Sequence, residues 1–121
     1  MSFLRRLVSR PYDDVDPGRA AELVGQGAVL LDVREPFEWQ AGHAPKARHI
    51  PLGQLAQRVR ELPADRPVVV VCRSGNRSAR AAAALVRDHG RTASNLRGGM
   101  RAWAAAGLPV VGRGGRPGSV A

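Results

Sequence analysis

The sequence predicts an α/β fold in which a parallel β-sheet is flanked by helices on both faces. Apolar runs that suit buried strands alternate along the chain with segments of helical character. Residues typical of turns, mainly glycine and proline, separate these segments. The length of 121 residues fits one domain with a single core. In such a sheet a ligand site lies beyond the carboxyl ends of the strands.

The strands are expected where apolar residues run without interruption. The run at 67–71 is the most hydrophobic of these segments, which places it at the centre of the sheet. The run at 28–33 also has the character of a buried parallel strand, and two shorter strands are expected nearby. The predicted strands are residues 28–33, 48–51, 67–71 and 93–96.

Helices are expected between these strands, and several carry signals at their ends. Asp16 followed by Pro17 is an N-cap with proline at the first helical position. Gly90 suits the C-terminal cap of an alanine-rich helix. The predicted helices are residues 17–25, 36–41, 52–59 and 78–89, with a last one that follows Gly98-Gly99, carries Trp103 in the core and ends at Gly107.

The folded unit is expected to span residues 12–111. Residues 1–11, which end at Pro11, are predicted to be a flexible N-terminal arm. Residues 112–121 are rich in glycine and are predicted to be a flexible C-terminal tail.

The charge and composition exclude some classes of partner. The formal net charge is +9, but only one of the 19 basic residues is lysine, and the arginines are dispersed along the chain. Aromatic residues make up 4% of the chain, and no motif typical of nucleic-acid binding is present. We therefore do not expect a nucleic-acid partner.

The first residues contain no apolar stretch long enough for a signal sequence or a membrane span. The single cysteine cannot form an internal disulfide. Together these features predict a cytoplasmic protein without a membrane partner, in a reducing compartment where thiol chemistry is sustained.

Cys72 is the leading candidate for a catalytic residue. It follows the central apolar run and precedes a helix, so the unpaired N–H groups and positive dipole end of that helix point toward its sulfur. Arg73 and Arg77 add positive charge. These features predict a thiolate at neutral pH, with a pKa of about 3.5–7.5.

The residues after Cys72 are expected to form a loop that binds an anion. Gly75 can adopt positive φ, which lets successive backbone N–H groups converge on one point. Guanidinium groups bind sulfonate or phosphate oxygens, short polar side chains form the rim, and Ser78 also suits a helix cap. The predicted binding loop is Arg73, Ser74, Gly75, Asn76, Arg77 and Ser78.

The spacing between the cysteine and the arginine in this loop distinguishes phosphatase chemistry from sulfur chemistry. Cysteine phosphatases carry an arginine six positions after the cysteine, where this chain has Ser78, while Arg77 comes five positions after. The loop is one residue shorter than in these phosphatases, and the smaller space that it encloses suits an additional sulfur atom on Cys72 better than a phosphoryl group. Phosphatase or arsenate reductase activity is therefore a minor alternative.

Three further residues are expected to support the loop. Asp32 and Arg34 lie at the end of a neighbouring strand, and bracing of loops is the favoured role for both. Glu38 offers a partner for Arg77, so that Arg77 either binds the substrate oxyanion or anchors the loop through this pair. His43 and His49 favour roles in turns or packing over metal binding, so no metal site is expected.

Four motifs in one order resemble the single-domain rhodanese family, which comprises thiosulfate sulfurtransferase-like modules. The resemblance covers nearly the whole predicted folded unit. The motifs are Leu31-Asp32-Val33-Arg34-Glu35, then Glu38 with Gly42-His43-Ala44-Pro45 and His49-Ile50-Pro51, then Val70-Val71-Cys72-Arg73-Ser74-Gly75-Asn76-Arg77-Ser78, and Leu96-Arg97-Gly98-Gly99-Met100 with Trp103.

The resemblance implies a rhodanese-like fold and a sulfurtransferase that works through a persulfide on Cys72, without a cofactor. The implied partners are small sulfur donors and acceptors, with thiosulfate or a persulfide as donor and cyanide or a thiol as acceptor. Because the chain has no second cysteine to resolve the persulfide, a non-enzymatic carrier that relays sulfur to a partner protein is the alternative.

Overall fold

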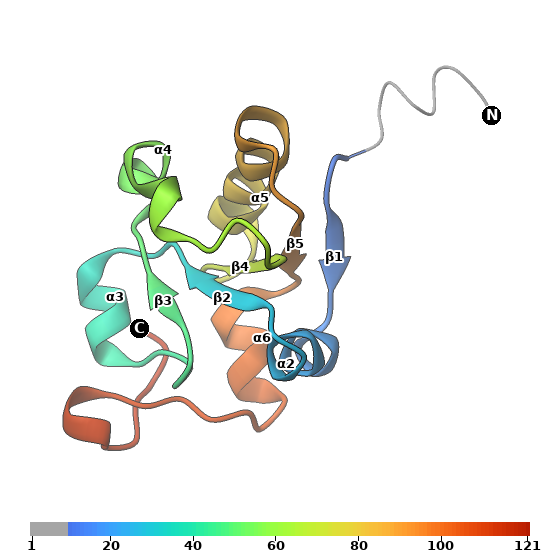
Figure 1. Ribbon diagram of the computed structural model, residues 1–121. Helices are drawn as coiled ribbons and strands as arrows, with labels where there is room; N and C mark the ends of the chain where they lie inside the picture. Colours follow the sequence, from blue (N-terminus) through green and yellow to red (C-terminus); the bar gives the residue numbers. More distant parts are fainter. Residues whose placement is uncertain (1–9) are drawn as a thin grey trace.

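The computed structural model describes residues 10–121, so residues 1–9 of the predicted arm lie outside the described residues. Five strands form one sheet in the order β1-β5-β4-β2-β3, and every strand pair is parallel (Figure 1). The predicted parallel sheet is confirmed, and the apolar strand β4 lies at its centre. The strands are β1 (Asp13–Val15), β2 (Val29–Asp32), β3 (Arg48–His49), β4 (Val68–Val71) and β5 (Ala93–Leu96).

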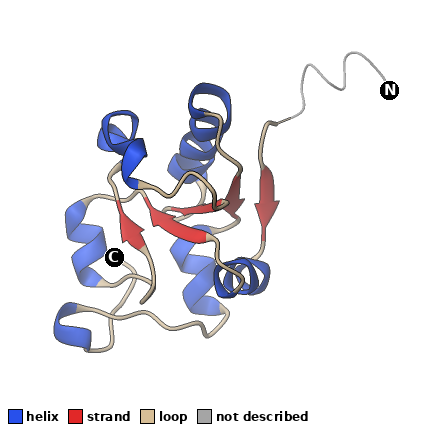
Figure 2. Cartoon of the chain, in the orientation of Figure 1, coloured by secondary structure: helices blue, strands red, loops and turns tan. Residues whose placement is uncertain are grey.

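Helices cover both faces of the sheet, as predicted (Figure 2). Helices α4 and α5 pack on one face, and α2 and α6 pack on the other (Figure 1). The helices are α2 (Pro17–Gly25), α3 (Pro36–Ala41), α4 (Leu55–Arg58), α5 (Asn76–His89) and α6 (Gly99–Ala105). Short 3-10 turns at Leu52–Gln54 and Val59–Glu61 flank α4, where the sequence predicts one helix.

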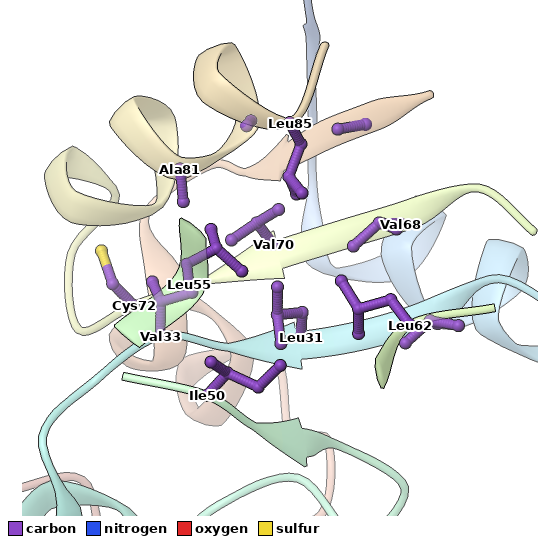
Figure 3. Packing of buried hydrophobic residues seen from close by; sticks show 13 residues of the cluster. Leu31, Val33, Ile50, Leu55, Leu62, Val68, Val70, Cys72, Ala81 and Leu85 are labelled. Atoms are coloured by element: carbon purple, nitrogen blue, oxygen red, sulfur yellow. The ribbon is translucent and has the colours of Figure 1, made fainter. Parts of the chain in front are cut away.

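The core divides into two clusters because side chains alternate along each strand. Along β4, Val68 and Val70 face α5, while Val69 and Val71 face α2 and α6. Cys72 continues the alternation of Val68 and Val70, so its side chain lies on the α5 side of the sheet. Figure 3 shows the sulfur pointing from the end of β4 toward the first turn of α5.

Two elements differ from the prediction. Strand β1 was not expected, because two of its three residues are aspartates, which are depleted in strands; it exists through its pairing with β5. Helix α5 begins at Asn76 rather than Ser78, because Gly75, with φ of 117°, serves as its N-cap. The role of Ser78 as a helix cap is therefore wrong, since this residue lies inside the first turn.

The C-terminal segment packs against the domain. The backbone of Val111 exchanges two hydrogen bonds of 2.9 Å with His43, and Ser119 N–H donates to the Ala41 carbonyl at 3.0 Å. At Gly42 a Cβ would overlap the backbone of Ser119, so only glycine permits this approach. The flexibility predicted for residues 112–121 stays a prediction, but the segment has specific contacts. Among the described residues, no helix has the length and apolar character needed to cross a membrane.

Candidate active site

The Cys72 sulfur is enclosed at the carboxyl edge of the sheet. The residue is 1% exposed and packs in the apolar cluster beneath α5. Its polar contacts come from the following loop and the first turn of α5: the Gly75 N–H donates to Sγ at 3.1 Å, and the Ser78 hydroxyl lies 3.2 Å from Sγ. The buried sulfur therefore has hydrogen-bond donors directed at it, as the predicted anion-binding loop requires.

The pKa of Cys72 reflects a balance between burial and these donors. Burial raises the pKa of the thiol, because it removes water from the charged form. Hydrogen bonds from the Ser78 hydroxyl and from the backbone N–H groups of Ser78, Gly75 and Ser74 outweigh burial and hold the pKa below its ordinary value. The direction agrees with the sequence prediction of a favoured thiolate.

The start of helix α6 contacts residues 72–77, which we call the active loop. The N–H of Met100 donates to the Cys72 carbonyl at 2.8 Å, and that of Arg101 donates to the Arg73 carbonyl at 3.1 Å. This approach depends on Gly99, where an added Cβ would lie 2.5 Å from the Cys72 carbonyl oxygen and closer still to that of Arg73. Gly99, the first residue of α6, thus permits the contact between this helix and the loop.

The two arginines of the loop have different partners. Arg77 forms a two-pronged ion pair with Glu38, with distances of 2.6 Å and 2.9 Å, so the structure has the anchoring arrangement that the sequence left as one alternative. Arg77 contributes the side-chain hydrogen bonds that hold the pKa of Glu38 below its usual range. Arg73 is exposed and donates through Nε to the backbone oxygen of Ala121 at 2.7 Å. Its role in oxyanion binding stays a prediction.

Asp32 and Arg34 form a buried brace, as the favoured interpretation of the sequence proposed. Both side chains are fully buried and are joined by an ion pair of 2.7 Å. Nη2 of Arg34 also donates to the Gly42 carbonyl at 2.7 Å, which ties the end of β2 to the turn after α3. Nη1 of Arg34 is the one buried side-chain nitrogen or oxygen without a hydrogen-bond partner among residues 10–121.

The two histidines pack around an indole. Trp39 stacks on His43, with ring centroids 3.6 Å apart, and on His49 at 4.8 Å. Nδ1 of His43 bonds the Trp39 carbonyl, and Nε2 of His49 bonds the Arg34 carbonyl. These contacts give both residues a packing role. Within the described part of the chain, no three His, Cys, Asp or Glu residues are grouped so that they could hold a metal ion.

The remaining loop residues form its outer rim. Ser74 and Asn76 are exposed, which suits the predicted rim, while Gly75 is buried beneath them. Ser78 is fully buried and reaches Asn95 on β5, which in turn contacts Asp14 on β1. Sequence reasoning missed Asn95 and Asp14. A polar side chain within the predicted strand 93–96 was a signal for Asn95, but nothing marked Asp14.

Comparison with known proteins identifies the family. The sequence model described as a rhodanese-like domain matches residues 16–106 of this chain. The chain belongs to the rhodanese-like domain family. The match contains the Asp32–Arg34 brace, the Cys72 loop and the glycine pair at the start of α6, and it ends before the C-terminal segment that reaches Arg73.

Similar proteins include sulfurtransferases. A protein named sulfurtransferase from Allochromatium vinosum is 43% identical over 86 residues, covering 71% of this chain and 80% of that protein. A protein named thiosulfate sulfurtransferase GlpE from Pseudomonas syringae pv. syringae is 39% identical over 92 residues, covering 76% of this chain and 87% of that protein. A rhodanese-related protein from Thermoplasma volcanium has the same fold, with a TM-score of 0.75 and 32% identity over 83% of this chain and 98% of that one.

Proposed function

We propose that this rhodanese-like chain is a sulfurtransferase that carries sulfane sulfur on Cys72 as a persulfide. The observation that carries the proposal is the buried sulfur with the Gly75 N–H at 3.1 Å and the Ser78 hydroxyl at 3.2 Å. Donors placed before the reaction stabilise the anionic sulfur without a cost of reorganisation. The proposal also draws on the relatives named sulfurtransferase.

The proposed reaction has two halves. In the first, the Cys72 thiolate attacks the outer sulfur of thiosulfate; a new sulfur–sulfur bond forms, the old one breaks, and sulfite leaves with the bonding electrons. In the second, an acceptor such as cyanide or a thiolate attacks the outer sulfur of the persulfide, and Cys72 leaves as the thiolate. A small persulfide serves as donor by the same steps. Neither half requires a metal or an organic cofactor.

Mass spectrometry of the intact protein tests this proposal. After incubation with thiosulfate, the protein is expected to gain the mass of one sulfur atom and to lose it on addition of cyanide. The Cys72→Ser variant is the matched control, and it should show no gain. Absence of the added mass with thiosulfate and with a small persulfide would contradict the proposal.

A carrier that relays sulfur to a partner protein is the second candidate, favoured by two observations. Cys72 is 1% exposed, so a donor or acceptor must displace covering atoms to reach the sulfur. It is also the only cysteine of the chain, so delivery of the sulfur must be intermolecular. Stable loading with slow turnover from thiosulfate to cyanide would indicate the carrier, and fast turnover would indicate the enzyme. Both roles fit the reducing cytoplasm, which we propose as the location.

A further inference from the structure

A chain of polar groups leads from the buried Cys72 sulfur to the half-buried Asp14 on strand β1. The Ser78 hydroxyl lies 3.2 Å from Sγ, 3.2 Å from the Gly75 carbonyl oxygen and 2.6 Å from Oδ1 of Asn95. Nδ2 of Asn95 lies 3.1 Å from Oδ1 of Asp14. The residues come from α5, β5 and β1, so the folded sheet brings together groups that are far apart in the sequence.

The orientation of Asn95 in this chain is fixed by its outer partner. A carboxylate accepts hydrogen bonds and does not donate them, so the amide NH₂ of Asn95 must face Asp14. The amide oxygen then faces Ser78, and it can only accept. Asp14 is itself held by an ion pair with Arg10 at 2.7 Å, at the rim of a polar surface pocket that these residues line with Asn95.

Ser78 therefore has one proton and more than one acceptor. A hydroxyl donates a single hydrogen bond. The distance of 2.6 Å to Asn95 is at the short end for a bond between two oxygens, so the amide oxygen is a strong competitor for this proton. When the proton points to Asn95, the thiolate of Cys72 loses its donor from Ser78 and keeps those from the backbone.

We propose that Asn95, oriented by Asp14, is a positioning residue that offers the Ser78 proton a second acceptor during sulfur transfer. While Cys72 is a thiolate, the hydroxyl donates to Sγ. Once a sulfur atom is attached, the negative charge moves to the outer sulfur, Sγ becomes neutral, and the hydroxyl turns to Asn95. The buried hydroxyl thus keeps a short hydrogen bond in both states, which favours loading over a site in which the Gly75 carbonyl oxygen, at 3.2 Å, is the only other acceptor.

The charged groups next to this network are held in ion pairs. Arg77 on α5 is the cation whose charge interacts with Cys72, and it is held by Glu38 on α3. Asp14 and Arg10 form the outer end of the network. Because Ser78 connects Asn95 to the sulfur, a double-mutant cycle of Ser78 and Asn95 separates the effect of this hydrogen-bond network on the thiol from the effect of these charges.

The pKa of the Cys72 thiol, measured by the pH dependence of its alkylation rate, tests the proposal. Ser78→Ala removes a donor and should raise the pKa by about one pH unit. Asn95→Leu removes the competing acceptor at similar side-chain size and should lower the pKa by about half a unit. In the Ser78→Ala background, Asn95→Leu should have no further effect. An unchanged or raised pKa in Asn95→Leu alone, or the same shift with and without Ser78, would overturn the proposal.

Asp14→Asn provides a second cycle if Asn95→Leu does not fold, because this side chain is 17% exposed and keeps its shape. It lets Asn95 turn its NH₂ toward Ser78, and it also removes a negative charge. The charge effect should persist in Ser78→Ala, whereas the orientation effect should disappear. A shift of equal size in both backgrounds would contradict the role of Asn95 orientation.

The role in sulfur loading rests on the proposed function, whereas the effect on the thiol pKa does not. The ratio of persulfide to free thiolate at a fixed ratio of thiosulfate to sulfite is expected to fall about threefold in Asn95→Leu, which matches the half-unit change in pKa. If the wild type takes up no sulfur, the proposed function fails while the pKa cycle still tests the network. If the wild type loads and Asn95→Leu loads equally well, the second-acceptor role fails.

Discussion

Gly99→Ala would disturb the contact between α6 and the active loop. The backbone of Gly99 has φ of 62°, a conformation that costs a residue with a side chain about 1–2 kcal/mol. The new Cβ would also meet the carbonyl groups of Cys72 and Arg73 at distances that real Cβ atoms do not adopt. The loop or the helix must therefore move.

The movement would weaken two backbone hydrogen bonds, from Met100 to the Cys72 carbonyl and from Arg101 to the Arg73 carbonyl. Each such bond contributes about 0.5–1.5 kcal/mol. Together with the backbone conformation, we expect the free energy of unfolding to fall by about 2–5 kcal/mol. Because the same carbonyl groups belong to the active loop, sulfur uptake by the folded fraction should fall as well.

Urea denaturation measures the free energy of unfolding, and Gly25→Ala is the matched control. Gly25 ends α2 with no atoms near an added Cβ and no positive φ, so alanine there should be neutral or stabilise by about 0.4–1 kcal/mol. A loss below 1 kcal/mol for Gly99→Ala, with sulfur uptake retained, would refute the reasoning.

Three further outcomes are expected. Glu38→Gln should lower the free energy of unfolding by about 1–3 kcal/mol at neutral pH, because Arg77 stabilises the ionised carboxyl. The folded pKa of Glu38 lies below the unfolded value, so the difference between variant and wild type should shrink as the pH falls below about 4. Asp32→Asn should cost about 3–5 kcal/mol in urea denaturation, because it leaves a fully buried arginine without its counter-ion. Deletion of residues 120–121 should free Arg73 and lower the thiosulfate concentration needed for half-maximal loading, and this effect should be absent in the Arg73→Ala background.

Each of these outcomes can fail in a distinct way. A difference for Glu38→Gln that stays constant from neutral pH to pH 3 would show that the ionised carboxyl is not the stabilising form. A loss below 1 kcal/mol for Asp32→Asn would show that the brace contributes little. If the deletion changes the thiosulfate concentration for half-maximal loading equally with Arg73 and with alanine at this position, it acts through the stability of the domain and not through Arg73.

The sequence predicted the sheet and the loop well because both depend on local signals. The apolar run of β4 is typical of a buried central strand, and the motifs around Cys72 place this residue in the loop that follows the strand. Strand β1 carried no such signal, because Asp13 and Asp14 disfavour a strand until β5 offers backbone partners. Sequence reasoning missed the residues whose structure depends on pairing with a distant segment of the chain, as β1 depends on β5.

The same argument explains the errors around the site. Ser78 has the side chain of a helix cap, but Gly75 adopts positive φ and begins the helix earlier, so the hydroxyl is free to contact the sulfur and Asn95. The contacts of the C-terminal segment were not predicted either, because a glycine-rich composition does not reveal a partner. The backbone of this segment approaches Gly42 closely.

The central claim, that the active loop holds the only sulfhydryl as an anion near neutral pH, is tested most directly by titration of that group. The ultraviolet absorbance of the thiolate is followed against pH, with the Cys72→Ser variant subtracted to remove the contribution of the single tyrosine. Burial raises the pKa, but the hydrogen bonds to the sulfur outweigh it, so the midpoint is expected below the ordinary value of about 8.5. A midpoint at or above that value would contradict the account.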